Sequence, residues 1–266
     1  MLKKFLLVIF SGLWCVTLVL AQRSANAQQN EPAVYKNNSC VSCHSQLAEP
    51  VRVSNKYLEW QFSKHREKGV SCDKCHGGNS TAADKQKAHT GVQKASVRES
   101  RLYAFNQPET CNTCHKSIVN SFVQSDHYKK LRAVGLGPTC NTCHAHMATK
   151  VLYSASEASD LCAQCHNAIN FLPPRPEIPA QAEDVILAFQ RANNVINWAK
   201  LLIAEGRRHG LNFDADETQL RQSEAVLSDA KIAWHSFELR DIRKRADDAY
   251  FAASRIKDSV RKRIAQ

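Results

Sequence analysis

The pattern of hydrophobic and polar residues divides this chain of 266 residues into three segments. Residues 5–21 are almost wholly apolar, residues 40–166 are mostly polar, and the chain from about residue 180 onward carries apolar side chains at helical spacing. A proline-rich stretch, residues 171–179, precedes the third segment, and its prolines interrupt any helix on either side. The pattern predicts a polar part and a helical part joined by a stiff connector.

The C-terminal segment, residues 180–266, predicts a hairpin of two long helices. An apolar stripe over residues 182–203 fits one helix face, and Gly206 and Gly210 mark its end. A second helix is predicted from Asp214 nearly to the C-terminus, a rod of roughly 75 Å if about 50 residues are helical. Its heptad seam comprises Ala225, Ser228, Ile232, His235, Leu239, Ile242, Ala246, Ala249, Ala253, Ile256 and Val260.

The first 27 residues predict a secretory signal peptide. Lys3 and Lys4 form a basic region, an apolar run follows, and Ala25-Asn26-Ala27 is a small-x-small cleavage site. The alternative is a retained membrane anchor, although about 17 apolar residues are short for a bilayer span. We therefore expect a periplasmic or otherwise exported protein, an extracellular location included, with no stable membrane span after cleavage.

Ten of the 11 cysteines form five Cys-x-x-Cys-His motifs. The motifs are Cys40–Cys43–His44, Cys72–Cys75–His76, Cys111–Cys114–His115, Cys140–Cys143–His144 and Cys162–Cys165–His166. Two thiols about one helical turn apart can form thioethers to one porphyrin, and the following histidine then binds the iron. Structural zinc or a redox dithiol would not require five copies with a histidine each time. The motifs predict five covalently bound c-type haems.

The middle segment is too poor in apolar residues to fold without these haems. Leu, Ile, Val and Phe account for 21 of its 127 residues, about 17%, which is below the level of ordinary globular domains. Five macrocycles would supply the missing core. We predict an all-α fold with much irregular loop and no significant β-sheet: a haem-packed domain over residues 28–170, the connector 171–179, and long antiparallel helices in 180–266.

Six histidines outside the motifs are candidates for the second axial ligand of each iron: His65, His89, His127, His146, His209 and His235. Met147 is the only methionine after residue 27, so we expect bis-histidine ligation at nearly every haem. His209 lies at a basic helix end and is predicted to face solvent. His89 could instead be a loop residue, His146 could tie its own haem to a neighbouring one, and His235 could be a packing residue in its seam.

His65 and His127 occur in matching contexts. Each ends an aromatic-x-x-Ser-x-His segment, which begins at Trp60 and at Phe122. With Gly69-Val70-Ser71 before Cys72 and Gly77 after His76, the pattern over residues 36–166 resembles the cytochrome c554 and hydroxylamine oxidoreductase superfamily. The resemblance implies that His65 and His127 are distal haem ligands. The chain lacks the Cys-x-x-Cys-Lys motif of most nitrite reductases, which argues against catalysis.

The net charge of +11 would ordinarily suggest nucleic acid or an anionic membrane as a partner. Signal cleavage would leave +8, and ten propionates on five haems would bring the assembled protein close to neutrality. Nucleic acid is therefore not an expected partner.

These features predict an exported cytochrome that carries electrons between redox protein partners through bis-histidine haems. One alternative is an oxidoreductase of nitrogen or sulfur compounds with one five-coordinate haem. A second alternative is a subunit of an extracellular conductive filament. The long C-terminal helix predicts self-association into a homo-oligomer.

Overall fold

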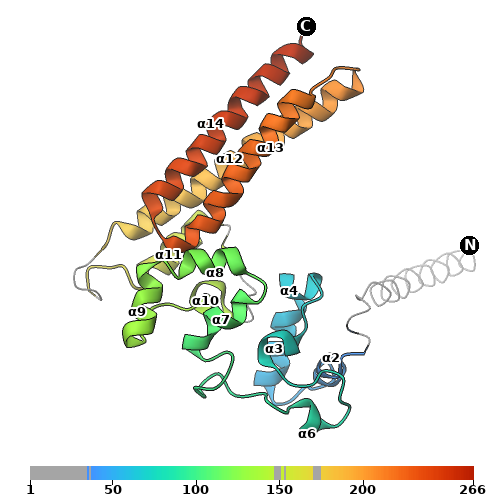
Figure 1. The fold of residues 1–266 in the computed structure, drawn as a ribbon, viewed down its shortest axis with the longest axis vertical. Coiled ribbons are helices and arrows are strands. Elements are labelled where there is room, and N and C mark those ends of the chain that lie inside the picture. The colour runs from blue at the N-terminus through green and yellow to red at the C-terminus, as the bar shows by residue number, and fades with distance from the viewer. Residues whose placement is uncertain (1–34, 36, 147–150, 153, 170–174) are drawn as a thin grey trace, which may run out of the picture. The chain divides into compact units, whose positions relative to one another are not determined.

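The computed structural model describes residues 35, 37–146, 151–152, 154–169 and 175–266. All regular secondary structure in these ranges is helical, which confirms the predicted fold class (Figure 1). The predicted signal peptide, Met147 and the first half of the proline-rich connector lie outside the described residues. The chain forms two compact units, which meet in sequence between Gln93 and Lys94, after the second attachment motif.

The first unit consists of short helices: α2 (Ser39–His44), α3 (Val51–Gln61), α4 (Lys64–Glu67), α5 (Cys72–His76) and α6 (Lys85–Ala88). Trp60 is buried and holds neighbouring segments together. Its indole Nε1 donates to the Val70 carbonyl at 2.9 Å, and its ring meets Tyr35 edge-on at 5.1 Å. The Tyr35 hydroxyl donates in turn to the Arg66 carbonyl at 2.5 Å. Polar and aromatic contacts thus replace a conventional apolar core.

The second unit begins with η2 (Ala104–Asn106), α7 (Gln107–Asn112), α8 (Lys116–Phe122), α9 (Asp126–Val134), α10 (Cys140–His144) and α11 (Ala155–Ala163). Buried hydrophobic side chains are scarce in the elements that precede α11. Among the described residues before Ala155, they are Tyr35, Val41, Trp60, Val119, Phe122 and Leu131. This scarcity matches the low apolar content of the sequence.

The remainder of the second unit is a bundle of three long helices, α12 (Ile178–Arg208), α13 (Asp214–Ala233) and α14 (Leu239–Ile264) (Figure 1). Ion pairs join Asp184 to Arg243 and Arg191 to Asp247, each at 3.0 Å, so α12 and α14 run in parallel. Helix α13 connects the C-terminal end of α12 to the N-terminal end of α14, and it runs antiparallel to both helices. The predicted apolar stripe of α12 is buried from Ala182 to Ile203.

The predicted single helix from Asp214 to the C-terminus is wrong in one respect, because the chain turns between α13 and α14. A 3-10 turn, η4 (Trp234–Ser236), is followed by Phe237 in the left-handed conformation, with φ 61°. The predicted seam assumed an uninterrupted helix. Its second half, from Leu239 to Val260, is buried, but Ala225 and Ser228 are exposed, and α13 instead buries Leu220, Ser223, Leu227 and Ala230.

The seam of α14 packs within its own chain. Ala246, Ala253 and Val260 have no exposed surface and belong to the same hydrophobic core as the stripe of α12. Small alanines allow the two helices to approach closely. Of the helices in the part of the chain that the structure describes, none has the length and apolar character needed to cross a membrane.

Candidate cofactor-binding site

Each attachment motif lies on a helical turn. In α2, α5 and α10 the whole motif is helical, while in α7 and α11 the motif continues the C-terminal end of the helix. The amide of His115 donates to the Cys111 carbonyl at 2.9 Å, and that of His166 to the Cys162 carbonyl at 2.8 Å. All five motifs therefore present two thiols and one imidazole at the spacing that a c-type haem requires.

Three of the motif histidines face a histidine from outside the motifs. The ring centroids of His44 and His89 are 6.1 Å apart, with an interplanar angle of 44°. Those of His127 and His166 are 5.9 Å apart at 47°, and those of His144 and His235 are 6.2 Å apart at 24°. Every pair joins one motif histidine to one predicted distal ligand.

These separations fit two axial ligands of one iron. A metal–imidazole bond is about 2.0–2.1 Å long, and each ring centroid lies about 1.2 Å behind the coordinating nitrogen. Two imidazoles on opposite sides of one metal ion should therefore have centroids about 6.4 Å apart. Among the described residues, no group of three or more His, Cys, Asp or Glu side chains is arranged to hold a metal ion. The three centroid separations, 5.9 to 6.2 Å, are close to the value expected for axial ligation of one iron.

Burial favours the neutral, iron-binding form of at least one imidazole in each pair. Burial lowers the pKa of His127 to about 4, with a further contribution from the neighbouring His166. Burial also lowers the pKa of His44, assisted by His89, and that of His235, assisted by His144. Protonation of both rings of a pair would place two positive charges about 6 Å apart, which is unfavourable. Within the described residues, Nδ1 of His127 is buried without a hydrogen-bond partner.

The repeated Ser-x-His segments have the same local structure. Ser63 and Ser125 are buried and cap the N-termini of α4 and α9, so that the histidine is the second residue of each helix. The Ser63 hydroxyl donates to the Trp60 carbonyl at 2.7 Å, and that of Ser125 donates to the Phe122 carbonyl at 2.6 Å. The sequence repeat therefore encodes a capped turn that fixes the start of the histidine-bearing helix.

The other three candidate distal histidines are His65, His146 and His209. His65 and His146 are half-buried, in the first and second unit respectively. His209 is two-thirds exposed and lies 3.1 Å from Glu205, which agrees with the solvent-facing position predicted for it. His65 and His146 are thus the distal candidates that remain for the motifs of His76 and His115.

Neighbouring motifs approach one another through their thiols. A hydrogen bond between Cys111 and Cys140 raises the pKa of the Cys111 thiol and lowers that of Cys140. Burial raises the pKa of Cys143 to about 11, and Cys162 contributes to the same shift. Burial likewise raises the pKa of Cys72 to about 11, with a contribution from Cys40. The thiols of the third, fourth and fifth motifs therefore interact in sequence order, and so do those of the first and second motifs.

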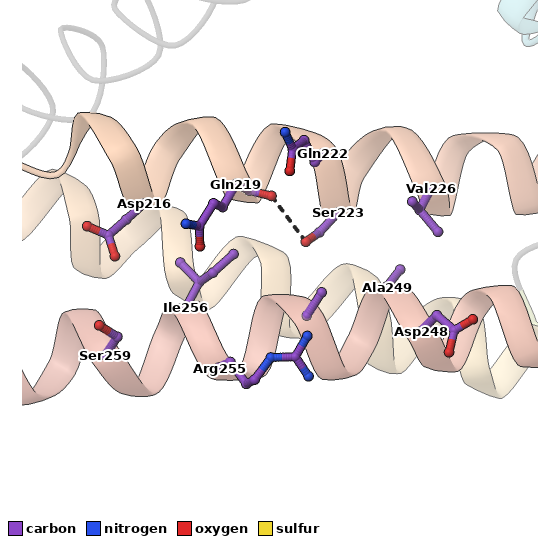
Figure 2. Close-up of a pocket in the computed structure, with 11 residues that line it drawn as sticks. Asp216, Gln219, Gln222, Ser223, Val226, Asp248, Ala249, Arg255, Ile256 and Ser259 are labelled. Atoms are coloured by element: carbon purple, nitrogen blue, oxygen red, sulfur yellow. Dashed lines mark hydrogen bonds between the residues drawn. The ribbon is translucent and has the colours of Figure 1, made fainter.

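A groove of about 670 Å³ lies elsewhere, between α13 and α14 (Figure 2). No cysteine or histidine lines it; its lining residues are Asp216, Gln219, Gln222, Ser223, Val226, Asp248, Ala249, Ala252, Arg255, Ile256 and Ser259. The groove carries none of the predicted haem chemistry.

The attachment motifs and imidazole pairs define the class of multihaem c-type cytochromes. Comparison with known proteins supports this class. The family described as "Cytochrome c7 and related cytochrome c" matches residues 23–116, a range that contains the first three motifs. The narrower resemblance to the cytochrome c554 and hydroxylamine oxidoreductase superfamily stays a prediction.

One curated relative is a C-type polyheme cytochrome, OmcC, from Geobacter sulfurreducens. It is 27% identical over 101 residues, which are 36% of this chain and 12% of that protein. The chain therefore spans only a small part of the length of this relative. No solved structure matches the chain.

Sequence reasoning did not identify which distal histidine belongs to which motif, because the two members of each pair are 39 to 91 residues apart in sequence. Cys162–His166 and His127 share a site although another attachment motif separates them. The sequence predicted that the last long helix folds back over the haem domain near Trp234 and Phe237, but it did not predict the contact between Phe237 and His127.

Proposed function

We propose that this chain is an exported pentahaem c-type cytochrome that carries electrons between redox protein partners through bis-histidine haems. The observation that carries the proposal is the three-fold recurrence of one arrangement, in which a motif histidine and a non-motif histidine have ring centroids about 6 Å apart. A six-coordinate iron has no open position for a substrate, so this arrangement favours electron transfer over catalysis.

The proposed ligand sets pair His44 with His89, His166 with His127, and His144 with His235. For the other two motifs we propose His65 as the partner of His76 in the first unit. We propose His146 as the partner of His115 in the second unit, which links the third and fourth haems through the adjacent residues His144 and His146.

When bound, each haem carries one electron on its iron. The polypeptide would fix the ligand geometry and limit access of water to the iron. Contacts among the thiols of the third, fourth and fifth motifs support short distances between their haems in the second unit. The contribution of Cys40 at Cys72 supports the same for the first and second haems.

Low-temperature EPR of the oxidised protein tests the proposal. Five low-spin haems are expected, together with a mass that exceeds the cleaved polypeptide by five haem units. Replacement of His89, His127 or His235 by Ala should convert one low-spin haem to high spin and leave all five attached. His209→Ala is the matched control and should leave the spectrum unchanged, because His209 is exposed and belongs to no pair.

Carbon monoxide binding separates the carrier from an enzyme. The reduced wild-type protein should bind no carbon monoxide, whereas each of the three His→Ala variants should bind one molecule per chain. Rapid binding by the wild type at one haem would favour the oxidoreductase of nitrogen or sulfur compounds instead.

Self-association through the C-terminal helices also stays a proposal. Trp198 and Leu201 on α12 and Phe251 on α14 are more than half exposed, and these apolar side chains support an interface on the bundle. Light scattering of the haem-loaded chain measures its oligomeric state directly, and fibres in the same sample would point to the filament alternative.

A further inference from the structure

The turn between α13 and α14 contains an unusual backbone conformation. Phe237 has φ 61° and ψ 20°, a left-handed conformation that is costly for a residue with a bulky side chain. Among the described residues, Ala145 is the only other non-glycine residue with positive φ, and it lies between His144 and His146. Ala145 thus directly adjoins two proposed haem ligands, and Phe237 lies two residues after a third, His235. Backbone strain of this kind is commonly retained where a side chain must be aimed at a functional site.

The left-handed turn brings the Phe237 ring against the imidazole of His127. The two ring centroids are 4.3 Å apart, and the interplanar angle of 71° makes the contact edge-to-face. The ring centroid of Trp234 lies 6.2 Å from that of Phe237 and 6.2 Å from that of Phe189 in the bundle core. Trp234 thus connects the Phe237 ring to the bundle core.

The other two paired distal candidates are oriented differently. Nδ1 of His89 lies 2.7 Å from the Lys85 carbonyl, and Nδ1 of His235 lies 3.2 Å from the Ile232 carbonyl. Such bonds fix the rotation of a metal-ligating imidazole. Nδ1 of His127 is buried and has no hydrogen-bond partner in the part of the chain that the structure describes. The Phe237 ring therefore occupies the role of orienting group at His127.

We propose that Phe237 is a positioning residue for the fifth haem: its ring fixes the rotation of the His127 imidazole, where the other two sites use a hydrogen bond to a backbone carbonyl. The inference rests on the proposed ligation by His127. It makes one turn serve two haems, because His235 of the same turn is the proposed ligand of the fourth.

EPR of four haem-loaded variants tests this inference. His127→Ala identifies the low-spin signal of the fifth haem as the one that is lost. Phe237→Gly and Phe237→Asn both remove the ring and both suit a left-handed backbone, so the turn should persist while the imidazole gains rotational freedom. Both should shift and broaden that one signal and change one midpoint potential of five. Leu187→Ala, at an exposed leucine of α12, is the control and should match the wild type.

The outcomes separate the inference from the proposed function. If His127→Ala removes one signal but both Phe237 variants match the wild type, ligation by His127 stands and the positioning role is refuted. If His127→Ala leaves the spectrum intact, the proposed ligand set is wrong and the inference fails with it. Changes at all five haems in both Phe237 variants would assign Phe237 to the fold as a whole and would also refute the inference.

Discussion

At the residue scale, the candidate ligands depend on small groups that control backbone position. Ser125 caps α9 one residue before the turn that carries His127, and Gly137 returns the chain close to the same helix. A Cβ atom at Gly137 would meet the carbonyl oxygen of His127 and would lie 2.5 Å from the Leu131 amide nitrogen. Only glycine allows this approach without a shift of backbone atoms.

Gly137→Ala should therefore displace the start of α9 and weaken ligation by His127. We expect partial conversion of one haem to high spin, measured by EPR, and carbon monoxide binding at a single site. Gly210→Ala is the control: Gly210 has φ +79° but open space around it, so the substitution should cost about 1–2 kcal/mol of stability and leave the haem spectrum unchanged. A wild-type spectrum in Gly137→Ala would contradict this prediction and would show that the loop after α9 moves while the start of the helix stays in place.

At the scale of elements, we expect the side of α14 that packs in the bundle core to tolerate added side-chain volume less than the side that lines the groove with α13. Ala253 has no exposed surface and lies in the seam between α14 and the rest of the bundle. Ala252, its neighbour in sequence, is half-buried and lines the groove between α13 and α14. The same substitution at the two positions compares a closed site with an open one.

Ala253→Leu should force the helices apart and lower the free energy of unfolding by about 1–3 kcal/mol. Ala252→Leu should be neutral or slightly stabilising, because the added carbons enter the groove. Denaturation of the bundle helices, followed by circular dichroism, measures both effects. Equal destabilisation by the two substitutions would contradict the packing described for α14.

At the scale of the whole molecule, the apolar core is unevenly distributed along the chain. The main cluster of buried side chains lies between Ala155 and Val260, and the described residues before it have few buried hydrophobic groups. Helix α12 and helix α14 bury complementary apolar faces without any cofactor. The first four attachment motifs have no comparable apolar support, whereas Cys162 of the fifth packs against this cluster.

The chain without haem should therefore be stable only in its C-terminal bundle. Amide hydrogen exchange on the full chain with all ten motif cysteines replaced by Ala should show protection within residues 178–264 and rapid exchange within residues 37–146. The physical reason is that too little apolar area is buried in the second range to offset the entropy of ordering it. Strong protection of α2 to α10 in that variant would show that these helices fold independently of haem.

The sequence by itself determined much of this protein. The Cys-x-x-Cys-His spacing is a local property of one helical turn, so the attachment motifs can be recognised without a structure. The helix of residues 178–208 and the C-terminal half of the heptad seam follow from apolar periodicity for the same reason. The Ser-x-His repeat at Ser63 and Ser125 also encodes a local structure, the capped turn.

Only the tertiary structure decided which histidine faces which motif, where the last long helix breaks, and how Phe237 meets His127. A left-handed turn at Phe237 contradicts the local preference of that residue, and it is stable because α14 packs on α12 once the chain has turned. The pairing of His127 with His166 depends on where separate helices come together. Such contacts arise from the packing of the whole unit, and no pattern of neighbouring residues specifies them.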